Sequence, residues 1–326
     1  MRAIVYQGKG DIDVIAIEDR SIRAPSGAEV RVAVSAAGVN RADILQRRGF
    51  YPAPPGAPAD IPGLEFAGSV ESVGPDVRAF QPGDRVMGIA AGGGMAGLLL
   101  AHERELMPIP EGMSVEEAAA IPEVFLTAFD ALYLQGGLRP GMDVLIHAAA
   151  SGIGTAAVQL VKAASARAFG TLRSASKLDA LAPYDFDGLI VAKDGSFIEG
   201  MRAHLSSADL ILDTVGAAYL KENIEALGSG GTLVTIGLLG GARGELNLGL
   251  VLAKRAAVRG SVLRSRPLEE KASLAQRFIR ECLPLFERGV LKASVDRVFE
   301  MDEIKEAQLA MERNENIGKL IVRIGS

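Results

Sequence analysis

The sequence contains very little cysteine, since Cys282 is the only one among 326 residues. A single cysteine excludes a disulfide within the chain, which fits a reducing compartment such as the cytosol. It also excludes a tetrahedral zinc site made of four cysteines, or of two cysteines and two histidines. The three histidines, His102, His147 and His204, lie far apart in the sequence. We therefore expect no bound metal, and the alternative is a site that the fold builds from all three histidines.

The sequence also lacks a large excess of charge of one sign, and it lacks long apolar runs. The chain has 35 Lys and Arg residues against 40 Asp and Glu residues, a formal net charge of −5, and no long run of one sign. Nucleic-acid binders cluster Lys and Arg against phosphates, so nucleic acid is not an expected partner. No stretch of about 18 residues is apolar throughout, which predicts no membrane span. The segment Met1–Tyr6 has a strand-like pattern rather than the apolar core of a signal peptide, and we expect a cytoplasmic protein.

Residues 1–110 have the pattern of a β-rich domain. The segment Val30–Val34 alternates with period two, and Val70–Val73 and Asp84–Met87 are short strand candidates between glycine and proline breaks. Many short strands with turn signals predict a sandwich or a partial barrel. The Pro- and Ala-rich segment Tyr51–Pro62 interrupts this pattern, and such long irregular segments are more often functional or mobile than structural.

From about residue 114 the pattern changes to alternating strands and helices. Ser114 and Glu117 have the spacing of a capping box, which predicts the start of a helix. The expected strands, with helical stretches between most of them, are Val144–His147, Ala168–Leu172, Leu189–Ala192, Leu210–Asp213 and Thr232–Ile236. This βαβ rhythm predicts an α/β fold with a doubly wound parallel sheet. We place that domain at residues 122–262, inserted into a discontinuous β-rich domain of residues 1–121 and 263–326.

The turn after the first of these strands carries the main motif. Val144–His147 runs into Ala148–Gly154, and the apolar helix Thr155–Ala164 follows. The pattern G-x-G-x-x-G of dinucleotide-binding turns fails at its first two positions, and only Gly154 matches its third. Small residues still permit a tight turn and a close pyrophosphate, and the helix N-terminus attracts phosphate. The alternative is an ordinary strand-to-helix turn, but the surrounding βα units favour a nicotinamide dinucleotide and hence an oxidoreductase.

The segment after the second strand bears on the choice of cofactor. An NAD site usually carries Asp or Glu about 20 residues beyond the glycine turn, where it binds the ribose 2′-hydroxyl. Here Arg173, Ser174 and Lys177 follow the strand, and no carboxylate appears before Asp179. Two cations and a hydroxyl suit a 2′-phosphate, so we predict NADPH rather than NADH. The alternative is that Arg173 and Lys177 are solvated loop cations.

Short segments along nearly the whole chain share a family pattern. They are Asn40–Asp43, Gly63–Gly68, Met107–Gly112, Ala118–Glu123, Leu126–Phe129, the turn with Gln159 and Lys162, Gly237–Gly241 and Asn316–Lys319. With them the chain resembles the zinc-independent medium-chain dehydrogenase/reductases, the quinone oxidoreductases related to zeta-crystallin, and among these the p53-inducible quinone oxidoreductase-like group. Zinc-dependent relatives have a cysteine at the position of Asn40 and a histidine at that of Leu64. The resemblance and the cysteine count both imply chemistry without a metal.

This resemblance implies a GroES-like β-rich catalytic domain and a Rossmann cofactor domain. Asn40, Asp43 and Tyr51 would line the substrate side as catalytic residues, where an Asn or Tyr can donate a hydrogen bond to a developing oxyanion. The expected cofactor contacts are Thr127, Ala150, Ser151, Gly152, Ile153, Arg173, Ser174, Lys177, Thr214, Gly237, Leu238, Leu239, Arg264 and Asn316. The alternatives are that Asn40 is a turn residue, that Asp43 caps a helix and that Tyr51 is a surface aromatic. Asn316 would alternatively belong to the last turn of a helix, and Glu65 is expected to be structural.

The expected activity is NADPH:quinone oxidoreduction. A quinone is already electrophilic, so it needs neither strong acid catalysis nor a metal to accept the hydride of the cofactor. Reduction of an α,β-unsaturated carbonyl (an enone or alkenal) is a rival, because it uses the same hydride geometry. A further alternative is an NADPH-binding structural or RNA-binding protein with little turnover, with Arg259, Arg264 and Arg266 as a local basic cluster. The resemblance also implies a homodimer that pairs through the apolar edge strand Val258–Leu263.

Overall fold

The structure is a computed structural model that describes residues 1–325. It divides into two compact units, the first made of Met1–Leu126 with the residues from Leu263 onwards, and the second of Thr127–Val262. The sequence placed the first boundary at 121/122 rather than 126/127. The two differ because helix α3 (Pro122–Phe129) runs across this part of the chain.

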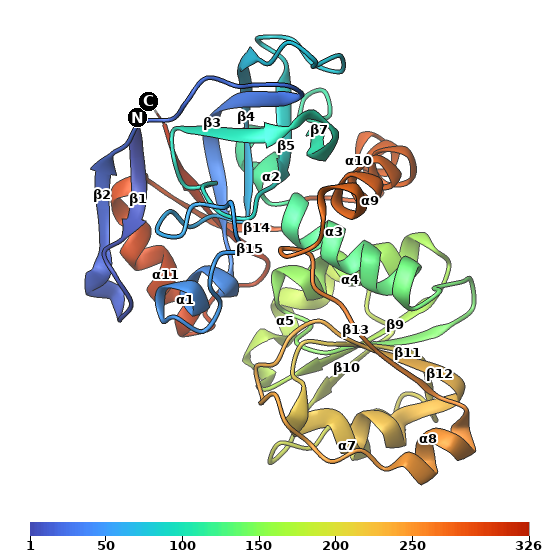
Figure 1. The fold of residues 1–326 in the computed structure, drawn as a ribbon. Coiled ribbons are helices and arrows are strands. Elements are labelled where there is room, and N and C mark those ends of the chain that lie inside the picture. Colours follow the sequence, from blue (N-terminus) through green and yellow to red (C-terminus); the bar gives the residue numbers. More distant parts are fainter. Residues whose placement is uncertain (326) are drawn as a thin grey trace. The chain divides into compact units, whose positions relative to one another are not determined.

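The strands of the first unit pair antiparallel, except for β14 and β15, which pair in parallel (Figure 1). Its larger sheet has seven strands in the order β14-β15-β3-β4-β5-β7, and β6 pairs with β3 as well. These strands are β3 (Glu29–Val39), β4 (Glu65–Val73), β5 (Arg85–Ile89), β6 (Leu98–His102), β7 (Leu106–Pro108), β14 (Val295–Phe299) and β15 (Lys319–Arg323). A separate two-stranded sheet pairs β1 (Arg2–Tyr6) with β2 (Ile15–Asp19). The predicted β-rich domain is therefore confirmed, and β15 brings the last strand of the chain against β3.

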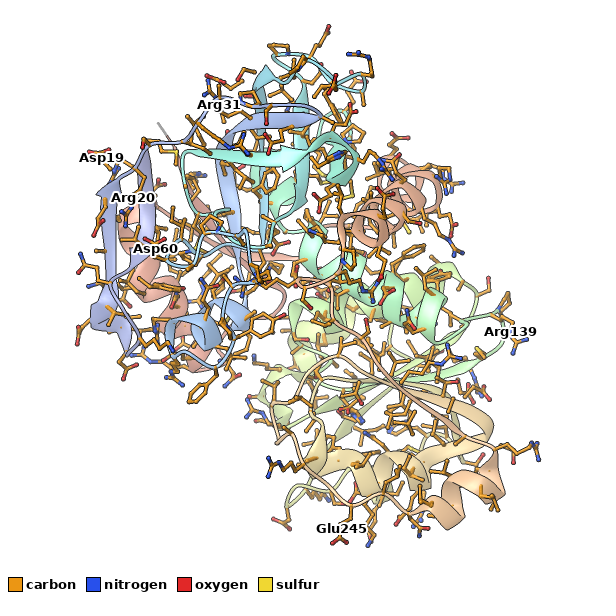
Figure 2. All side chains as sticks on the ribbon, viewed as in Figure 1. Asp19, Arg20, Arg31, Asp60, Arg139 and Glu245 are labelled. Carbon is orange, nitrogen blue, oxygen red and sulfur yellow. The ribbon has the colours of Figure 1, made fainter. Side chains whose placement is uncertain are left out.

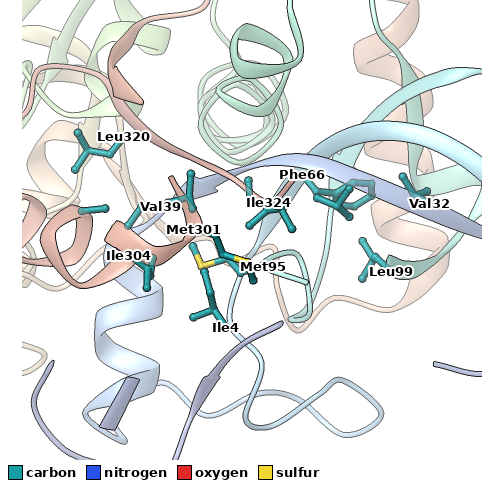
Figure 3. Close-up of a cluster of buried hydrophobic side chains, with 14 of the residues drawn as sticks. Ile4, Val32, Val39, Phe66, Met95, Leu99, Met301, Ile304, Leu320 and Ile324 are labelled. Carbon is teal, nitrogen blue, oxygen red and sulfur yellow. The ribbon is translucent and has the colours of Figure 1, made fainter. Parts of the chain in front are cut away.

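Alternation along β3 explains how this sheet covers a core. Val30, Val32 and Val34 are buried, while Arg31 and Ala33 between them are partly exposed, as period-two patterning requires. The core gathers side chains from both ends of the chain, and Figure 3 shows some of them: Ile4, Val32, Val39, Phe66, Met95, Leu99, Met301, Ile304, Leu320 and Ile324. The N-terminal and C-terminal segments thus share one core.

Short helices complete the first unit. They are α1 (Arg41–Arg47), α2 (Val115–Ala119), the first part of α3, α9 (Leu268–Glu281), α10 (Leu283–Glu287) and α11 (Ile304–Glu312), with single 3-10 turns at Ile12–Val14, Glu103–Glu105 and Met301–Glu303. The predicted capping box starts α2: the Ser114 hydroxyl accepts the Glu117 N–H, and the Glu117 carboxylate accepts the Ser114 N–H. An ion pair between Arg20 and Asp60, with 2.8 Å between Nη2 and Oδ2, ties the loop Tyr51–Pro62 to the chain beyond β2 (Figure 2).

The second unit is a six-stranded, wholly parallel sheet in the order β10-β9-β8-β11-β12-β13. The strands are β8 (Asp143–Ile146), β9 (Arg167–Leu172), β10 (Gly188–Val191), β11 (Ala208–Asp213), β12 (Leu227–Thr235) and β13 (Ala257–Gly260). Numbered from the start of the unit, this is the order 3-2-1-4-5-6 of dinucleotide-binding folds. The predicted doubly wound sheet is confirmed.

The connections between these strands are helical. The helices are α4 (Gly152–Ala163), α5 (Leu178–Leu181), α6 (Ile198–Arg202), α7 (Ala217–Ala226) and α8 (Leu248–Lys254), with a π-helical turn at Asp130–Gln135 and 3-10 turns at Ala175–Lys177 and Ala182–Tyr184. Among residues 1–325, no helix is both long and apolar enough to cross a membrane.

Candidate functional site

The turn between β8 and α4 is closed by Ser151 and Gly154. Ser151 is the N-cap of α4, and its Oγ accepts the N–H of Gly154 at 3.0 Å. A Cβ atom on Gly154 would lie 2.4 Å from the carbonyl oxygen of Ala149 and 2.6 Å from that of Ala148. No side chain fits there, so the third glycine of the motif is the one that the packing of helix on turn requires. Ala148 itself has a φ of 54°, which makes the turn tight without a glycine.

The strand order places a topological switch point between β8 and β11, where dinucleotides bind in such sheets. Thr214 follows β11 at this carboxyl edge, and its buried hydroxyl has no hydrogen-bond partner within the described chain. Gly237 follows β12, and a Cβ atom there would lie 2.9 Å from the carbonyl oxygen of Thr214. Leu238 and Leu239 come next and are 56% and 62% exposed. An unsatisfied hydroxyl and two exposed apolar side chains fit a polar and aromatic ligand at this edge.

Asp213, which the sequence reasoning missed, organises the same edge. Its carboxylate accepts the N–H groups of Val215 and Gly216 and the hydroxyl of Thr235. It therefore holds the turn that carries Thr214. Its position as the last residue of a predicted buried strand was the available signal.

The segment after β9 carries the residues predicted to bind the cofactor, but one of them makes a local hydrogen bond within the segment. Arg173 is exposed and Lys177 is half-buried. Ser174 caps a short 3-10 turn, because its Oγ accepts the N–H of Ser176 at 3.2 Å. The remaining predicted contacts near the turn are Ala150, which is buried, and Gly152 and Ile153, which are half-buried at the start of α4.

His147, which directly precedes the turn, is buried. Its Nδ1 is 2.9 Å from Thr171 Oγ1, and its Nε2 is 2.6 Å from Asn223 Oδ1. Burial lowers the pKa of this imidazole, so a neutral ring with Nε2 donating to Asn223 fits the contacts. No group of three or more His, Cys, Asp or Glu residues among residues 1–325 is placed to hold a metal ion.

In the first unit, a buried polar cluster surrounds Asn40. We call Asn40, Glu65 and Lys319 the Asn40 cluster. Lys319 Nζ donates to Asn40 Oδ1 at 2.7 Å and lies 2.5 Å from Glu65 Oε1. Asn40 Nδ2 in turn donates to Glu65 Oε1 at 2.9 Å and to the carbonyl oxygen of Gly38 at 3.2 Å. Both amide hydrogens of Asn40 are therefore directed into the protein.

Asp43 lies beside the Asn40 cluster and is fully buried. Its carboxylate accepts the N–H of Asn40 at 2.8 Å and that of Gly63 at 3.2 Å. Burial raises the pKa of Asp43 to about 6, against the lowering effect of these two hydrogen bonds. In this geometry Asp43 joins the start of α1 to the segment before β4.

Glu123 is a second carboxyl near the cluster. Its backbone N–H donates to Glu65 Oε2 at 2.8 Å, and its side chain is half-buried near the start of α3. Burial and the charge of Glu65 raise the pKa of Glu123 to about 8. In the sequence, Glu123 and Lys319 were noted only as parts of family segments and had no assigned role. A linear pattern does not show that both lie near Glu65.

Arg264 lies against Tyr51, within the first unit. Its guanidinium centre is 5.1 Å from the centroid of the Tyr51 ring, and its Nη1 donates to the Tyr51 carbonyl oxygen at 3.1 Å. Arg264 is only 7% exposed, so it does not contribute to an open basic surface with Arg259 and Arg266. Tyr51 is half-buried rather than a fully exposed aromatic.

The two remaining predicted residues lie at segment ends. Thr127 is half-buried within α3, the first residue of the second unit. Asn316 lies in the loop before β15, where its Nδ2 donates to the carbonyl oxygen of Gly318 at 2.7 Å. The alternative that Asn316 ends a helix is wrong, because α11 ends at Glu312.

Two family models match the chain. Residues 26–111 match the alcohol dehydrogenase GroES-like domain, and residues 152–280 match a model described as zinc-binding dehydrogenase. The synaptic vesicle membrane protein VAT-1 homolog of Rattus norvegicus is 31% identical over 99% of this chain and 84% of its own length. The spectinabilin polyketide synthase system protein NorB of Streptomyces orinoci is 35% identical over 90% of this chain, which spans 13% of that protein.

Solved structures are similar to this chain over nearly its whole length. An NAD-dependent alcohol dehydrogenase superposes with a TM-score of 0.88 at 30% identity, covering 100% of both chains. The human synaptic vesicle membrane protein VAT-1 homolog-like protein has a TM-score of 0.87 at 28% identity, covering 100% of this chain and 98% of its own. The CurK enoyl reductase has a TM-score of 0.85 at 28% identity, covering 99% and 98%.

Proposed function

The chain belongs to the medium-chain dehydrogenase/reductase superfamily, and we propose that it is an oxidoreductase that reduces quinones with NADPH and without a metal. The observation that carries this proposal is the state of Tyr51. Its ring is held by Arg264, while its hydroxyl makes no hydrogen bond within residues 1–325. Among our three catalytic candidates, Tyr51 is therefore the one whose hydrogen-bond donor is not used within the protein.

The roles of the other two candidates follow from their contacts. Both N–H bonds of Asn40 are used by Glu65 and Gly38, and both oxygens of Asp43 accept backbone N–H groups. We therefore propose that Asn40 and Asp43 shape the substrate side, and that the Tyr51 hydroxyl donates to the oxygen on which charge develops. Asn40 and Leu64 offer no cysteine or histidine at the positions where zinc relatives have them, which supports reduction without a metal.

The dinucleotide would be held by the carboxyl edge of the parallel sheet. The start of α4 supplies free N–H groups to the pyrophosphate, and Thr214 supplies a buried hydroxyl that is otherwise unsatisfied. When bound, the nicotinamide supplies the hydride. The protein's part is to orient the two reactants and to stabilise the oxyanion.

We propose NADPH as the cofactor because of the segment after β9. Arg173 and Lys177 are cations, and no carboxylate lies between Arg167 and Lys177 to bind a ribose 2′-hydroxyl. A hydrogen bond from a charged group contributes about 1.5–3 kcal/mol, enough for a clear preference between the two cofactors.

Reduction of an α,β-unsaturated carbonyl is the second candidate. It is favoured by one finding, the match to the CurK enoyl reductase at 28% identity. A measurement of NADPH oxidation against a panel of quinones and enones decides between them. Faster turnover of quinones supports our proposal, and faster turnover of enones replaces it. Tight NADPH binding without turnover of quinones or enones would support a binding protein instead. The variant Tyr51→Phe is expected to lower kcat on the preferred substrate class.

We also propose that the protein is cytoplasmic and acts as a homodimer. The single cysteine is typical of a reducing compartment. Strand β13 pairs with β12 on one side and is a sheet edge on the other, and Val258 on it is 43% exposed. An exposed apolar edge strand favours pairing with a second copy.

A further inference from the structure

Arg264 connects three segments of the first unit. Its Nε donates to the carbonyl oxygen of Ala91 at 2.8 Å, its Nη1 to that of Tyr51 at 3.1 Å, and its Nη2 to Gln46 Oε1 at 2.6 Å. The guanidinium group is planar with donors in fixed directions, so these contacts set the spacing of the three segments. A lysine has one compact ammonium group and cannot reproduce them.

Gln46 extends this connection to the far end of the loop Tyr51–Pro62. Its Nε2 donates to the carbonyl oxygen of Ala59 at 3.1 Å, while its Oε1 accepts from Arg264. The loop contains no helix or strand of its own. These side-chain contacts therefore hold it together with backbone hydrogen bonds at its two ends, such as that from the Tyr6 N–H to the Asp60 carbonyl oxygen. Arg264 thus acts directly on the beginning of the loop and through Gln46 on its end.

The ring of Tyr51 is the side chain that Arg264 covers. The guanidinium centre lies 5.1 Å from the ring centroid, within the range of a cation–π interaction. Because Arg264 is 7% exposed, water does not weaken this contact much. The charge of Arg264 also opposes the effects of burial and of Glu123, which together raise the pKa of Tyr51.

We propose that Arg264 is a positioning residue for the reaction, which holds Tyr51 and its loop in the conformation that presents the Tyr51 hydroxyl to the substrate. This inference rests on the proposed role of Tyr51 as oxyanion donor. It replaces our expectation of a cofactor contact for Arg264, because the side chain is 7% exposed and each of its three nitrogens donates to a residue of the first unit.

The test compares Arg264→Lys with Arg266→Lys in the full-length protein. Arg266 lies on the same segment, and its guanidinium is 3.9 Å from Glu270. For Arg264→Lys we expect kcat on the preferred substrate to fall about 10- to 100-fold, as for a misplaced reacting group. The Kd for NADPH, titrated without substrate, should stay within about twofold of the wild-type value, since binding energy to the cofactor is unchanged. Arg266→Lys should leave both quantities unchanged.

Two further measurements separate positioning from a general loss of structure. Amide hydrogen exchange of residues 48–60 should rise in Arg264→Lys, with exchange in the second unit unchanged. In a Tyr51→Phe background, Arg264→Lys should lower kcat little further, because a residue that acts through Tyr51 has nothing left to position.

Each of these measurements has an outcome that would contradict the positioning role of Arg264. A Kd for NADPH that weakens in parallel with kcat would overturn the proposal and restore a cofactor contact. Additive effects of Arg264→Lys and Tyr51→Phe would overturn it as well. If Tyr51→Phe alone leaves kcat unchanged, the proposed donor role fails, whereas unchanged exchange of residues 48–60 in Arg264→Lys contradicts the positioning of the loop itself.

Discussion

Lys319 Nζ lies 2.5 Å from Glu65 Oε1, and the two side chains are 3% and 0% exposed. A charge that is buried to this extent is stable only with a partner of opposite sign and with hydrogen bonds. Here Asn40 supplies one hydrogen bond to each, as acceptor for Lys319 and donor for Glu65. The Asn40 cluster is thus one unit, whose members depend on one another.

Removal of one charge from this pair should destabilise the protein strongly. Lys319→Met leaves the Glu65 carboxylate buried without its partner, and we expect a loss of about 3–5 kcal/mol in the free energy of unfolding. The double variant Lys319→Met, Glu65→Gln should recover part of that loss. Urea denaturation monitored in both units measures this, and a single variant as stable as the wild type would show that the pair is not effectively buried.

Gly154→Ala tests the turn at the start of α4. The added Cβ atom would meet the carbonyl oxygens of Ala148 and Ala149 at 2.6 Å and 2.4 Å, so the helix must move away from the turn. We expect NADPH binding to weaken at least about tenfold, since the N–H groups that face the pyrophosphate shift with the helix. The matched control is Gly260→Ala in the same unit, where a Cβ atom has nothing within 4 Å. Equal Kd values for the two variants would refute this role of Gly154.

The origin of the cofactor preference can be tested by replacing two cationic residues. Arg173→Ala and Lys177→Ala should each weaken NADPH binding about tenfold or more and leave NADH binding nearly unchanged, because only NADPH carries the 2′-phosphate. Isothermal titration with both cofactors gives the four Kd values. Tighter binding of NADH by the wild-type protein would contradict our choice of NADPH.

Glu123 should make stability depend on pH in a defined direction. Folding raises the pKa of this carboxyl from 4.5 to about 8, so the folded chain holds the proton more tightly than the unfolded chain. The free energy of unfolding therefore falls as the pH rises through this range. Glu123→Gln cannot ionise, and its midpoint temperature should exceed that of the wild type above pH 8 by a margin that vanishes below pH 4.5. The exposed Glu111→Gln is the control, and a margin that is independent of pH would contradict the assignment.

The proposed dimer predicts a mass of twice the 34.1 kDa chain in light scattering at micromolar concentration. Val258→Lys places a charge on the open edge of β13 and should shift the mass towards that of one chain. Val290→Lys, at a valine of similar exposure in the first unit, should not. A wild-type protein of single-chain mass would exclude the dimer.

Much of the fold could be predicted because its signals are local. The βα rhythm of residues 143–235 gave the parallel sheet, and Ser114 with Glu117 gave a helix start that the structure confirms. The spacing of glycines was a poorer guide. Ala149 and Ser151 break the expected pattern, yet Gly154 sits where no side chain fits.

The candidate site was less accessible to sequence reasoning because its contacts join distant segments. Lys319 bonds to Val39, 280 residues away, and Arg264 bonds to Gln46 across 218 residues. No pattern of spacing reports such pairs. Asn40 and Asp43 were singled out from their motif, but only the contacts show that their polar atoms are used within the protein.

The pairing of β15 with β3 has a consequence for how the protein is made. The second unit is complete once Val262 has left the ribosome, whereas the sheet of the first unit still lacks β15 and Glu65 still lacks Lys319. In stalled chains that expose residue 262 but not 319, we expect residues 143–235 to resist protease and residues 29–89 to be cleaved. Equal resistance of both would contradict this order. During synthesis, the unit to which we assign the cofactor would thus mature before the unit to which we assign the substrate.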